Sequence, residues 1–548
     1  MLQQRFKTSF AENIFKQKYA QGPNDTWDAL TERLIDDVCG TRGGTTQALM
    51  SQEDRNLLIH YHKEMKWLAG GRYLYYAGRS ASFFNNCYLL RAEEDTREEW
   101  ANIAWRSMNC LTTGGGIGID YSRLRPEGRP LSRTGGISSG PLPLMSAINE
   151  IGRSVMQGGS RRSAIYASLN WLHEDIPMFL KAKNWSDDVK AAKAKDFNAI
   201  GYLDMTNISV NYDDKWLLNA DRANLHTFKE NCRQAMMTGE PGFSFNFGLK
   251  QNETLRNACT EVTSEDDSDV CNLGSINLGN MESLEEFHTV VTLVSKFLVC
   301  GTLRADLPYE KVYKVREKNR RLGVGLMGIH EWLLKKGYGY EVTPELHEWL
   351  KVYKDESKRA ADEHCDHLYI SRPVAYRAIA PTGSIGILSS TTTGIEPLFA
   401  VAYKRRYLTE GTKWKYEYVV DATADLLIKE YGLEPSKIET AYGLSHDYEK
   451  RLKFQADIQD YVDMSISSTI NLPSWGSKGN SEYDVSTFAR TLAKYAPRLR
   501  GFTCYPDGAR GGQPLTEVDY RDAMKHKGTI FAENDICDIS GKGGTCGV

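Results

Sequence analysis

The sequence lacks several features that would place the protein in a simple class. Lys and Arg total 68 against 71 Asp and Glu in 548 residues, so there is no basic excess for binding nucleic acid through its phosphates. The richest apolar stretch, residues 288–303, is interrupted by Lys296 and is too short for a membrane span. The N-terminal segment has no apolar core of a secretory signal. We therefore expect a cytoplasmic protein that has neither nucleic acid nor a membrane as its partner.

The closely spaced cysteine pairs of a zinc site are also lacking, although the chain has 11 cysteines. Structural zinc sites usually combine two such Cys or His pairs, so we expect no metal site. A reducing cytoplasm disfavours a disulfide framework, which leaves packing or redox chemistry as the role of these thiols. Internal repeats and low-complexity linkers are not found either.

What is present is the composition of a folded protein, with 41% hydrophobic and 25% charged residues. The length allows two to four domains, or one large barrel with attached helices. Apolar residues recur at three- and four-residue steps over residues 10–79 and again over 97–111, which predicts helices. Strand-like apolar segments alternate with helical ones and indicate an α/β architecture with largely parallel strands. These segments are residues 163–171, 198–212, 239–248, 321–332 and 378–390.

One short segment gathers three kinds of reactive side chain. Cys259 has Asn257 two positions before it and Glu261 two positions after it. In an extended segment, residues two apart project to the same side, so we expect a thiol, a carboxylate and an amide to face one small volume. Cys271 follows twelve positions later, and the SEDDSD segment between them is expected to turn the chain back. Inert buried thiols remain the alternative interpretation.

Three glycine-containing segments have two interpretations each. Residues 112–120 (TTGGGIGID) are expected to end a helix and start a strand, because a dinucleotide-binding motif would need a different setting. Residues 381–386 (PTGSIG) offer N–H groups and hydroxyls in a turn that opens a helix and suits a phosphate, or they form an ordinary Ser/Thr-rich turn with a cap. Residues 157–164 (QGGSRRSA) are a basic loop that touches a nucleotide, or a solvated turn.

The order of the short motifs resembles that of the catalytic subunit of ribonucleotide reductases. The resemblance extends from near the N-terminus to the last residues, and it is carried by the order and spacing of the motifs rather than by any one of them. In chain order the motifs are NNCYLL, TGGGIGID, GGISSGPLP, QGGSRRSA, NACTE, DVCNLGSINL, NRRLGVGLMGI, PTGSIGIL, STINLP, TCYPDGAR and a terminal cysteine pair.

The resemblance implies a fold and a division of the chain. The family fold is a ten-stranded α/β barrel, in which two five-stranded parallel halves run antiparallel to each other around a central finger loop. A helical N-terminal region precedes the barrel. By similarity, residues 1–86 would form that helical region, residues 87–524 the barrel, and residues 525–548 a flexible redox tail.

The resemblance also implies a thiyl-radical reaction that converts ribonucleotides into 2′-deoxyribonucleotides. By similarity, Cys259 would remove the 3′ hydrogen of the ribose, Glu261 would take the 3′-hydroxyl proton, and Asn257 would hydrogen-bond the sugar. Cys87 and Cys271 match the pair that supplies two electrons and becomes a disulfide as the 2′-hydroxyl leaves as water. These roles agree with the need of a radical for a dry enclosure and of a base for hydrogen-bond reach.

On the tail, Cys537 and Cys546 resemble the thiols that exchange with the oxidised pair and then with thioredoxin or glutaredoxin. Their separation of nine positions is longer than the family pattern. The substrate is expected to contact residues of the phosphate turn and of two loops, namely Thr382, Gly383, Ser384 and Ile385 for the phosphates, with Ser139 and Asn86.

The resemblance further implies control by a dNTP or ATP effector that binds at the interface of a homodimer. No long insertion follows the GGGIGID motif, which favours a homodimer over a monomer. The 86 residues before Cys87 resemble a helical N-terminal region rather than an ATP-cone, so on/off control through such a cone is not expected. The expected effector residues are Asp95, Arg125, Gly158, Gly159, Arg161 and Arg162.

The radical source has two alternatives at the TCYPDGAR motif. Tyr505 is followed by Pro506, which cannot carry a hole, and this resembles the small adenosylcobalamin-dependent class II form. We therefore expect adenosylcobalamin as the cofactor. The alternative is a class I-type subunit, in which a ferritin-like partner with a dimetal cofactor delivers the radical through tyrosines. A non-catalytic nucleotide-binding regulator is the remaining possibility, and it would not need the cysteines.

Overall fold

The N-terminal part of the chain is helical and contains one short strand. The computed structural model describes residues 5–155, 163–196, 199–270, 272–409, 413–509, 515–527 and 530–532. The helices begin where the sequence offers caps, since Thr8, Thr26 and Ser51 each accept a hydrogen bond from the N–H three residues later. The helical prediction for residues 10–79 is confirmed apart from β1. The elements are α1 (Ser9–Lys18), α2 (Trp27–Cys39), α3 (Gln52–Lys63), β1 (Trp67–Ala69) and α4 (Gly71–Tyr76).

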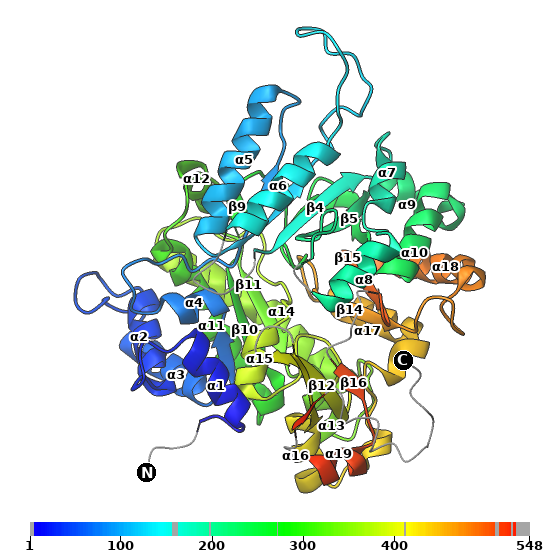
Figure 1. The fold of residues 1–548 in the computed structure, drawn as a ribbon. Coiled ribbons are helices and arrows are strands. Elements are labelled where there is room, and N and C mark those ends of the chain that lie inside the picture. The colour runs from blue at the N-terminus through cyan, green and yellow to red at the C-terminus, as the bar shows by residue number, and fades with distance from the viewer. Residues whose placement is uncertain are drawn as a thin grey trace.

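The first half of the sheet structure is a set of five parallel strands connected by helices, in the upper part of Figure 1. All residues of the first two strands are buried, as expected for strands covered on both faces. The strands are β2 (Cys87–Arg91), β3 (Gly116–Asp120), β4 (Ile165–Asn170), β5 (Thr206–Tyr212) and β6 (Gly242–Phe245). The helices are α5 (Arg97–Thr112), α6 (Leu142–Ser154), α7 (Ile176–Lys181), α8 (Asp187–Lys195), α9 (Asp214–Leu217) and α10 (His226–Thr238).

The second half also has parallel pairing. β10 (Leu273–Asn277) pairs with β11 (Gly323–Met327), and β14 (Thr469–Leu472) pairs with β15 (Gly501–Pro506). Single parallel bridges, Val324 to Arg377 and Ile379 to Ile466, lie between these two pairs. The helices of this half are α11 (Leu284–Arg304), α12 (Glu310–Asn319), α13 (Ile329–Lys335), α14 (Pro344–His367), α15 (Gly383–Ser389), α17 (Tyr448–Gln459) and α18 (Val485–Tyr495).

The two halves meet in an antiparallel pair. Phe502 of β15 lies opposite Phe243 of β6, so one eight-stranded sheet runs β14-β15-β6-β5-β4-β3-β2-β9. β9 (Asp269–Val270) is antiparallel to β2 at the other edge. Among the described residues no strand pair joins this edge to β10, so a fully closed barrel is not seen. The predicted α/β class with parallel halves is confirmed to this extent.

One sequence prediction of a strand is wrong. Residues 378–390 were expected to be extended, but only Ile379 makes a strand-type bridge, and α15 occupies Gly383–Ser389. Thr382 is the N-cap of this helix, with a left-handed φ of 51°. The chain reverses at this residue because the left-handed conformation stops an extended segment. The apolar residues that suggested a strand face the core from a short helix instead.

Helix α11 contains the apolar stretch of residues 288–303, which is predicted from the sequence to be too short for a membrane span. By length and composition it could cross a membrane, but two thirds of its most apolar window is buried within the protein. It packs against α14 and, through Phe297, against Trp67 of β1, with the ring centroids 4.9 Å apart. The helix is therefore explained as a core helix of the second half.

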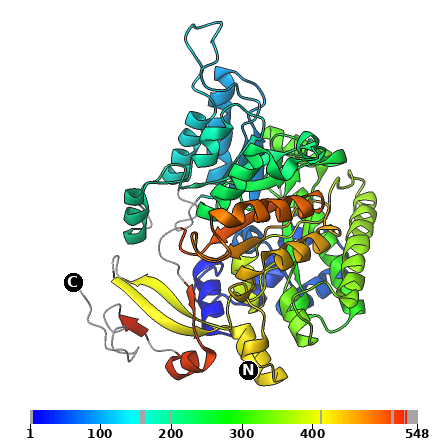
Figure 2. The same cartoon turned by 90° about the vertical axis from the view of Figure 1, so that its right-hand side faces the viewer.

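A separate antiparallel sheet contains the C-terminal strands and extends from the main body in Figure 2. Its strand order is β16-β12-β13-β17. Helices α16 and α19 accompany it. The elements are β12 (Ala402–Thr409), β13 (Lys413–Val420), β16 (Leu515–Glu517), β17 (Ile530–Ala532), α16 (Ala422–Tyr431) and α19 (Tyr520–His526).

Candidate active site

A two-stranded hairpin carries the predicted Cys259 segment. β7 (Leu255–Arg256) pairs antiparallel with β8 (Thr263–Ser264), so residues 257–262 form the tip. The tip is a turn, because the N–H of Thr260 donates to the carbonyl of Asn257 at 3.0 Å and Thr260 has a φ of 70°. The expected extended conformation of this segment is therefore wrong. The left-handed residue between Cys259 and Glu261 reverses the chain locally.

The hairpin packs closely against strand β3, because β3 has glycines at the positions of contact. A Cβ atom on Gly118 would lie 1.8 Å from the carbonyl oxygen of Arg256, and one on Gly116 would lie 3.1 Å from the Cβ of Ala258. The prediction that residues 112–120 end a helix and start a strand is confirmed, since α5 ends at Thr112 and β3 begins at Gly116. No local pattern marks these glycines as the contact surface for the hairpin, because the approach of a distant segment depends on the fold.

We expect Gly118→Ala to displace the hairpin and to lower activity strongly. The new methyl group overlaps a backbone carbonyl, which cannot rotate away as a flexible side chain would. Gly274→Ala in β10 is the matched control, because its Cβ would meet its neighbours at 3.5 Å or more. Steady-state activity and thermal unfolding of both variants test this. Equal effects at both positions would contradict it.

Two polar side chains at the tip are buried, and one atom of each forms no hydrogen bond with the described residues. Asn257 and Glu261 are 0% and 1% exposed, and Cys259 is partly exposed. Within the described part of the chain, the Nδ2 of Asn257 and the Oε2 of Glu261 have no hydrogen-bond partner. Burial raises the pKa of Glu261 to about 7, against a smaller opposing effect of the Asn257 side chain. An unpaired donor, a carboxyl that titrates near neutrality and a thiol therefore share one hairpin tip.

Cys87 lies beside this hairpin, as the first residue of β2. It belongs to a small buried cluster that includes Leu255 of β7 and Val262, the last residue of the tip. Tyr88 lies opposite Val270 in the antiparallel pair of β2 and β9. Cys271 itself lies outside the described residues. The structure therefore brings Cys87 to the hairpin, and brings together the chain neighbours of the two predicted redox cysteines.

The segment before β9 was expected to be a turn, and it is a buried one. Asp267 and Asp269 are 2% and 0% exposed. Asp267 accepts a hydrogen bond from the N–H of Arg91 at 2.7 Å and pairs with Lys311 at 2.7 Å. From sequence alone an acidic run of this kind is predicted to be exposed to solvent, because the cationic residues that pair with it are distant in the chain.

Tyr505 and a cavity lie at one end of the β14–β15 pair. Tyr505 is opposite Asn471, and Pro506 is opposite Leu472. A cavity of about 240 Å³ is found at this end. Its walls combine two aromatic rings with hydroxyl, amide, imidazole and carboxylate groups. The lining residues are Phe399, Tyr442, Ser445, His446, Asn471, Leu472, Pro473, Ser474, Ser477 and Asp507.

The predicted phosphate turn opens α15. The hydroxyl of Thr382 accepts a hydrogen bond from the N–H of Gly394 at 2.8 Å, which ties the turn to the chain beyond the helix. Gly383 has open space around its Cα, and Ile385 is buried. Lys18 of α1 donates to the hydroxyl of Ser384 at 3.4 Å, so the N-terminal helical region reaches this turn.

The remaining predicted residues divide into described and undescribed ones. Arg125 and Asp95 form an ion pair of 2.5 Å, each with about a third of its side chain exposed. Ser139 is exposed, and the side-chain oxygen of Asn86 accepts from the N–H of Arg72 at 3.3 Å. The others lie outside the described residues, namely Gly158, Gly159, Arg161, Arg162, Cys537 and Cys546.

Comparisons with known proteins agree on one family. The family model for the barrel domain of ribonucleotide reductase matches residues 85–241, 226–348 and 372–496. A vitamin B12-dependent ribonucleoside-diphosphate reductase of Mycobacterium tuberculosis is 25% identical over 538 residues, which cover 86% of this chain and 74% of that protein. One from Thermoplasma acidophilum is 28% identical over 503 residues, covering 80% and 63%.

A solved structure shows the same fold. The crystal structure of a B12-dependent (class II) ribonucleotide reductase matches with a TM-score of 0.70 and 15% identity, over 94% of this chain and 93% of that one. At this identity the match speaks for the fold alone. The family model spans most of the residues from 85 to 496, and the chain therefore belongs to the ribonucleotide reductase family, as a large subunit.

Proposed function

We propose that this ribonucleotide reductase acts by thiyl-radical chemistry at Cys259. The observation that carries the proposal is the hairpin tip, where Asn257 and Glu261 are buried beside a partly exposed cysteine. Each of the two leaves one polar atom without a partner among the residues that the structure describes. Unpaired buried polar groups cost stability and persist where a ligand satisfies them. A ribose with its 2′- and 3′-hydroxyls supplies both a donor and an acceptor for these atoms.

The reaction then divides among the residues of this chain. The Cys259 sulfur radical takes the 3′ hydrogen of the ribose and becomes a thiol. Glu261 accepts the 3′-hydroxyl proton and Asn257 orients the sugar. Cys87 and Cys271 give up two electrons and two protons to form a disulfide, while the 2′-hydroxyl leaves as water and a hydrogen takes its place. The Cys259 thiol returns its hydrogen to C3′, and Glu261 returns the proton to the 3′-oxygen, so that the radical, the base and the 3′-hydroxyl are all restored.

The remaining assignments are proposals as well. Thr382, Gly383, Ser384 and Ile385 would hold the substrate phosphates, with Ser139 and Asn86 near the substrate. Asp95 and Arg125, with the loop residues Gly158, Gly159, Arg161 and Arg162, would bind a dNTP or ATP effector in a homodimer. Cys537 and Cys546 would pass electrons from thioredoxin or glutaredoxin. We also propose that the two halves close into a ten-stranded barrel, and that residues 1–86, 87–524 and 525–548 form three regions.

The cavity beside Tyr505 fits the cofactor that the relatives' names indicate. Phe399 and Tyr442 offer stacking surfaces for a purine, and Ser445, Asn471 and Ser474 offer partners for amide and ribose groups. At about 240 Å³ the cavity suits the nucleoside end of adenosylcobalamin rather than the whole molecule. We propose that these residues hold that end. When bound, the cofactor supplies the one-electron oxidant that makes the Cys259 radical.

Reconstitution separates the two radical sources. We expect the purified chain, with adenosylcobalamin and a dithiol reductant, to form deoxyribonucleotides without any other protein. The reason is that Pro506 follows Tyr505, which breaks a relay of adjacent tyrosines. The measurement is deoxynucleotide formation from di- and triphosphate substrates with the cofactor, with a metal-loaded ferritin-like subunit, and with neither. Activity that depends on the added subunit would establish the class I-type alternative instead.

A further inference from the structure

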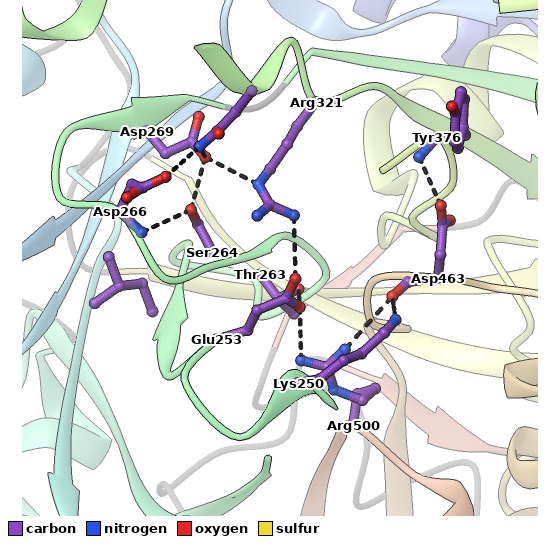
Figure 3. Close-up of polar contacts among 12 residues, drawn as sticks. Lys250, Glu253, Thr263, Ser264, Asp266, Asp269, Arg321, Tyr376, Asp463 and Arg500 are labelled. Atoms are coloured by element: carbon purple, nitrogen blue, oxygen red, sulfur yellow. Dashed lines mark hydrogen bonds and ion pairs between the residues drawn. The ribbon is translucent and has the colours of Figure 1, made fainter. Parts of the chain in front are cut away.

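A chain of ion pairs, buried except for the partly exposed Glu253, lies at the base of the hairpin (Figure 3). Arg321 donates from Nε to the Oδ2 of Asp269 at 2.9 Å, and its Nη1 lies 3.5 Å from the Oε1 of Glu253. Arg500 donates to the Oε2 of Glu253 at 3.0 Å. We call these four residues the Asp269–Arg321–Glu253–Arg500 chain. None of them is among the residues to which the proposed function gives a role.

The chain joins elements that are far apart in sequence. Arg321 precedes β11 and Arg500 precedes β15, so both arginines come from the second parallel half. Glu253 precedes β7 of the hairpin, and Asp269 is the first residue of β9. The link therefore runs from the second half, through the hairpin base, to the strand that pairs with β2.

Strand β8 binds both carboxylates of the chain through hydroxyl groups. Thr263 donates to the Oε2 of Glu253 at 2.7 Å, and Ser264 donates to the Oδ2 of Asp269 at 2.6 Å. These two residues are consecutive and follow directly on the hairpin tip. The position of the tip is thus tied by hydrogen bonds to the same two carboxylates that the arginines hold.

The two central members of the chain, Glu253 and Arg321, stay charged near neutral pH. Burial alone would raise the pKa of Glu253, but the charges of Arg500 and Arg321 outweigh it and hold the pKa at about 2. Burial opposes the charge of Arg321, and Asp269 and Glu253 more than compensate, so the pKa of Arg321 is raised. The links are therefore charge-assisted hydrogen bonds, which define geometry more strictly than neutral ones.

The chain also sets the position of the strand beside Cys87. Asp269 lies opposite Leu89 of β2, and Val270 lies opposite Tyr88, the residue after Cys87. The Ser264–Asp269 hydrogen bond of 2.6 Å thus connects β8, which follows the tip that bears Cys259, to β9, which pairs with the strand that bears Cys87. A displacement of one relative to the other needs this bond and the Arg321 pair to change.

We propose that Asp269, Arg321 and Glu253, with Ser264, are positioning residues that set the distance between the radical thiol and the reducing thiols. This inference rests on the proposed function. Removal of hydrogen at C3′ and reduction at C2′ take place on neighbouring carbons of one sugar. The radical thiol and the reducing thiols must therefore both lie within reach of that sugar at the same time. A misplacement of about 1 Å costs about 100-fold in such a reaction.

The test compares the rate of hydrogen removal at C3′ with the rate of deoxynucleotide formation. In a substrate labelled with tritium at C3′, the label moves to the Cys259 sulfur, from which it returns to carbon or exchanges with water. We expect Asp269→Asn to lower deoxynucleotide formation by about 10- to 100-fold, with KM changed less than about threefold. Tritium released per deoxynucleotide should rise by about tenfold or more, because the first step continues while the second is misaligned.

Two further variants keep the test decisive. Ser264→Ala leaves every charge in place and removes two hydrogen bonds, the one that Ser264 donates to Asp269 and the one that it accepts from the N–H of Asp266 at 3.1 Å. It carries the test if Asp269→Asn does not fold, and we expect a smaller rise of the same ratio. Lys318→Gln is the matched control, because Lys318 pairs with Asp266 of the same turn at 2.9 Å but lies on the exposed side. We expect its ratio to equal that of the wild type.

The outcomes distinguish failure of this inference from failure of the proposed function. Wild-type protein that releases no tritium and forms no deoxynucleotide would overturn the proposed function. Wild-type protein that does both, with Asp269→Asn and Ser264→Ala lowering both in proportion, would overturn only the positioning role. Proportional loss is what a smaller folded fraction produces, and a raised ratio is what misalignment produces.

Discussion

Cys259→Ser is expected to abolish deoxynucleotide formation, by more than about 10⁴-fold, the scale on which loss of a covalently acting group affects an enzyme. A serine hydroxyl has nearly the size of the thiol, but it does not form a stable radical that can remove and return the 3′ hydrogen. Because Cys259 is partly exposed at a hairpin tip, the free energy of unfolding should change by less than about 0.5 kcal/mol. Substrate and effector binding should persist.

The measurement combines product formation with binding and unfolding of the same preparation. Cys232→Ala in α10 is the matched control, since Cys232 is fully buried in the core and has no assigned role. It should lose some stability and keep its activity. Residual deoxynucleotide formation by Cys259→Ser within tenfold of the wild type would remove the thiyl mechanism from this position.

Glu261→Gln is expected to lower kcat by about 10²- to 10⁴-fold, the usual contribution of a positioned general base, and to make the protein more stable. The pKa of Glu261 is raised by burial from an ordinary 4.5 to about 7. Between these values the unfolded chain releases a proton that the folded chain keeps, so wild-type stability falls as pH rises through this window. At pH 8 the loss amounts to about 3 kcal/mol, and glutamine avoids it.

The pH dependence provides the check. The stability difference between Glu261→Gln and the wild type should be largest above pH 7 and should disappear below pH 4.5. Wild-type kcat/KM should rise with pH as Glu261 loses its proton near pH 7, and this rise should be absent in the variant. Urea unfolding at pH 5 and pH 8 and a pH–rate profile give both quantities. A variant that is less stable than the wild type at pH 8 would contradict the assigned pKa.

The same result bears on the non-catalytic alternative. A protein that only bound nucleotides would gain stability by replacing a buried carboxyl that lacks a partner at one oxygen. On the proposed function, the reaction needs a base with a pKa near the working pH, and this need explains the presence of Glu261 at this position.

Local patterns in the sequence predicted those parts of the fold and site that depend on near neighbours. The helices of the N-terminal region follow apolar periodicity and Ser/Thr caps, and the segment with Asn257, Cys259 and Glu261 spans only five positions. The extended conformation was wrong because Thr260 adopts a left-handed φ, which no propensity of threonine suggests. Local patterns could not predict long-range contacts, and the nearness of Cys87 to the Cys259 hairpin was implied only by the family resemblance.

Gly118 and Arg321 are two residues whose importance could not be predicted from the sequence. The importance of Gly118 comes from the carbonyl of Arg256, and that of Arg321 comes from carboxylates more than 50 positions earlier in the chain. In sequence the first is one glycine of a helix-to-strand transition and the second is one basic residue of a motif. Only the fold brings their partners to them, so a single sequence contains no pattern that marks them.

Strand β1 has a practical consequence for anyone who wishes to produce the catalytic part alone. Leu68 lies opposite Ser275 of β10, and the region before Cys87 thus completes a ladder of the second half. A shortened protein that starts at residue 85, where the family model begins, would lack β1. It would expose the backbone edge of β10 and the apolar surface around Phe297 that Trp67 covers. Bare edges of this kind recruit other chains, so a trimmed version would precipitate rather than crystallise.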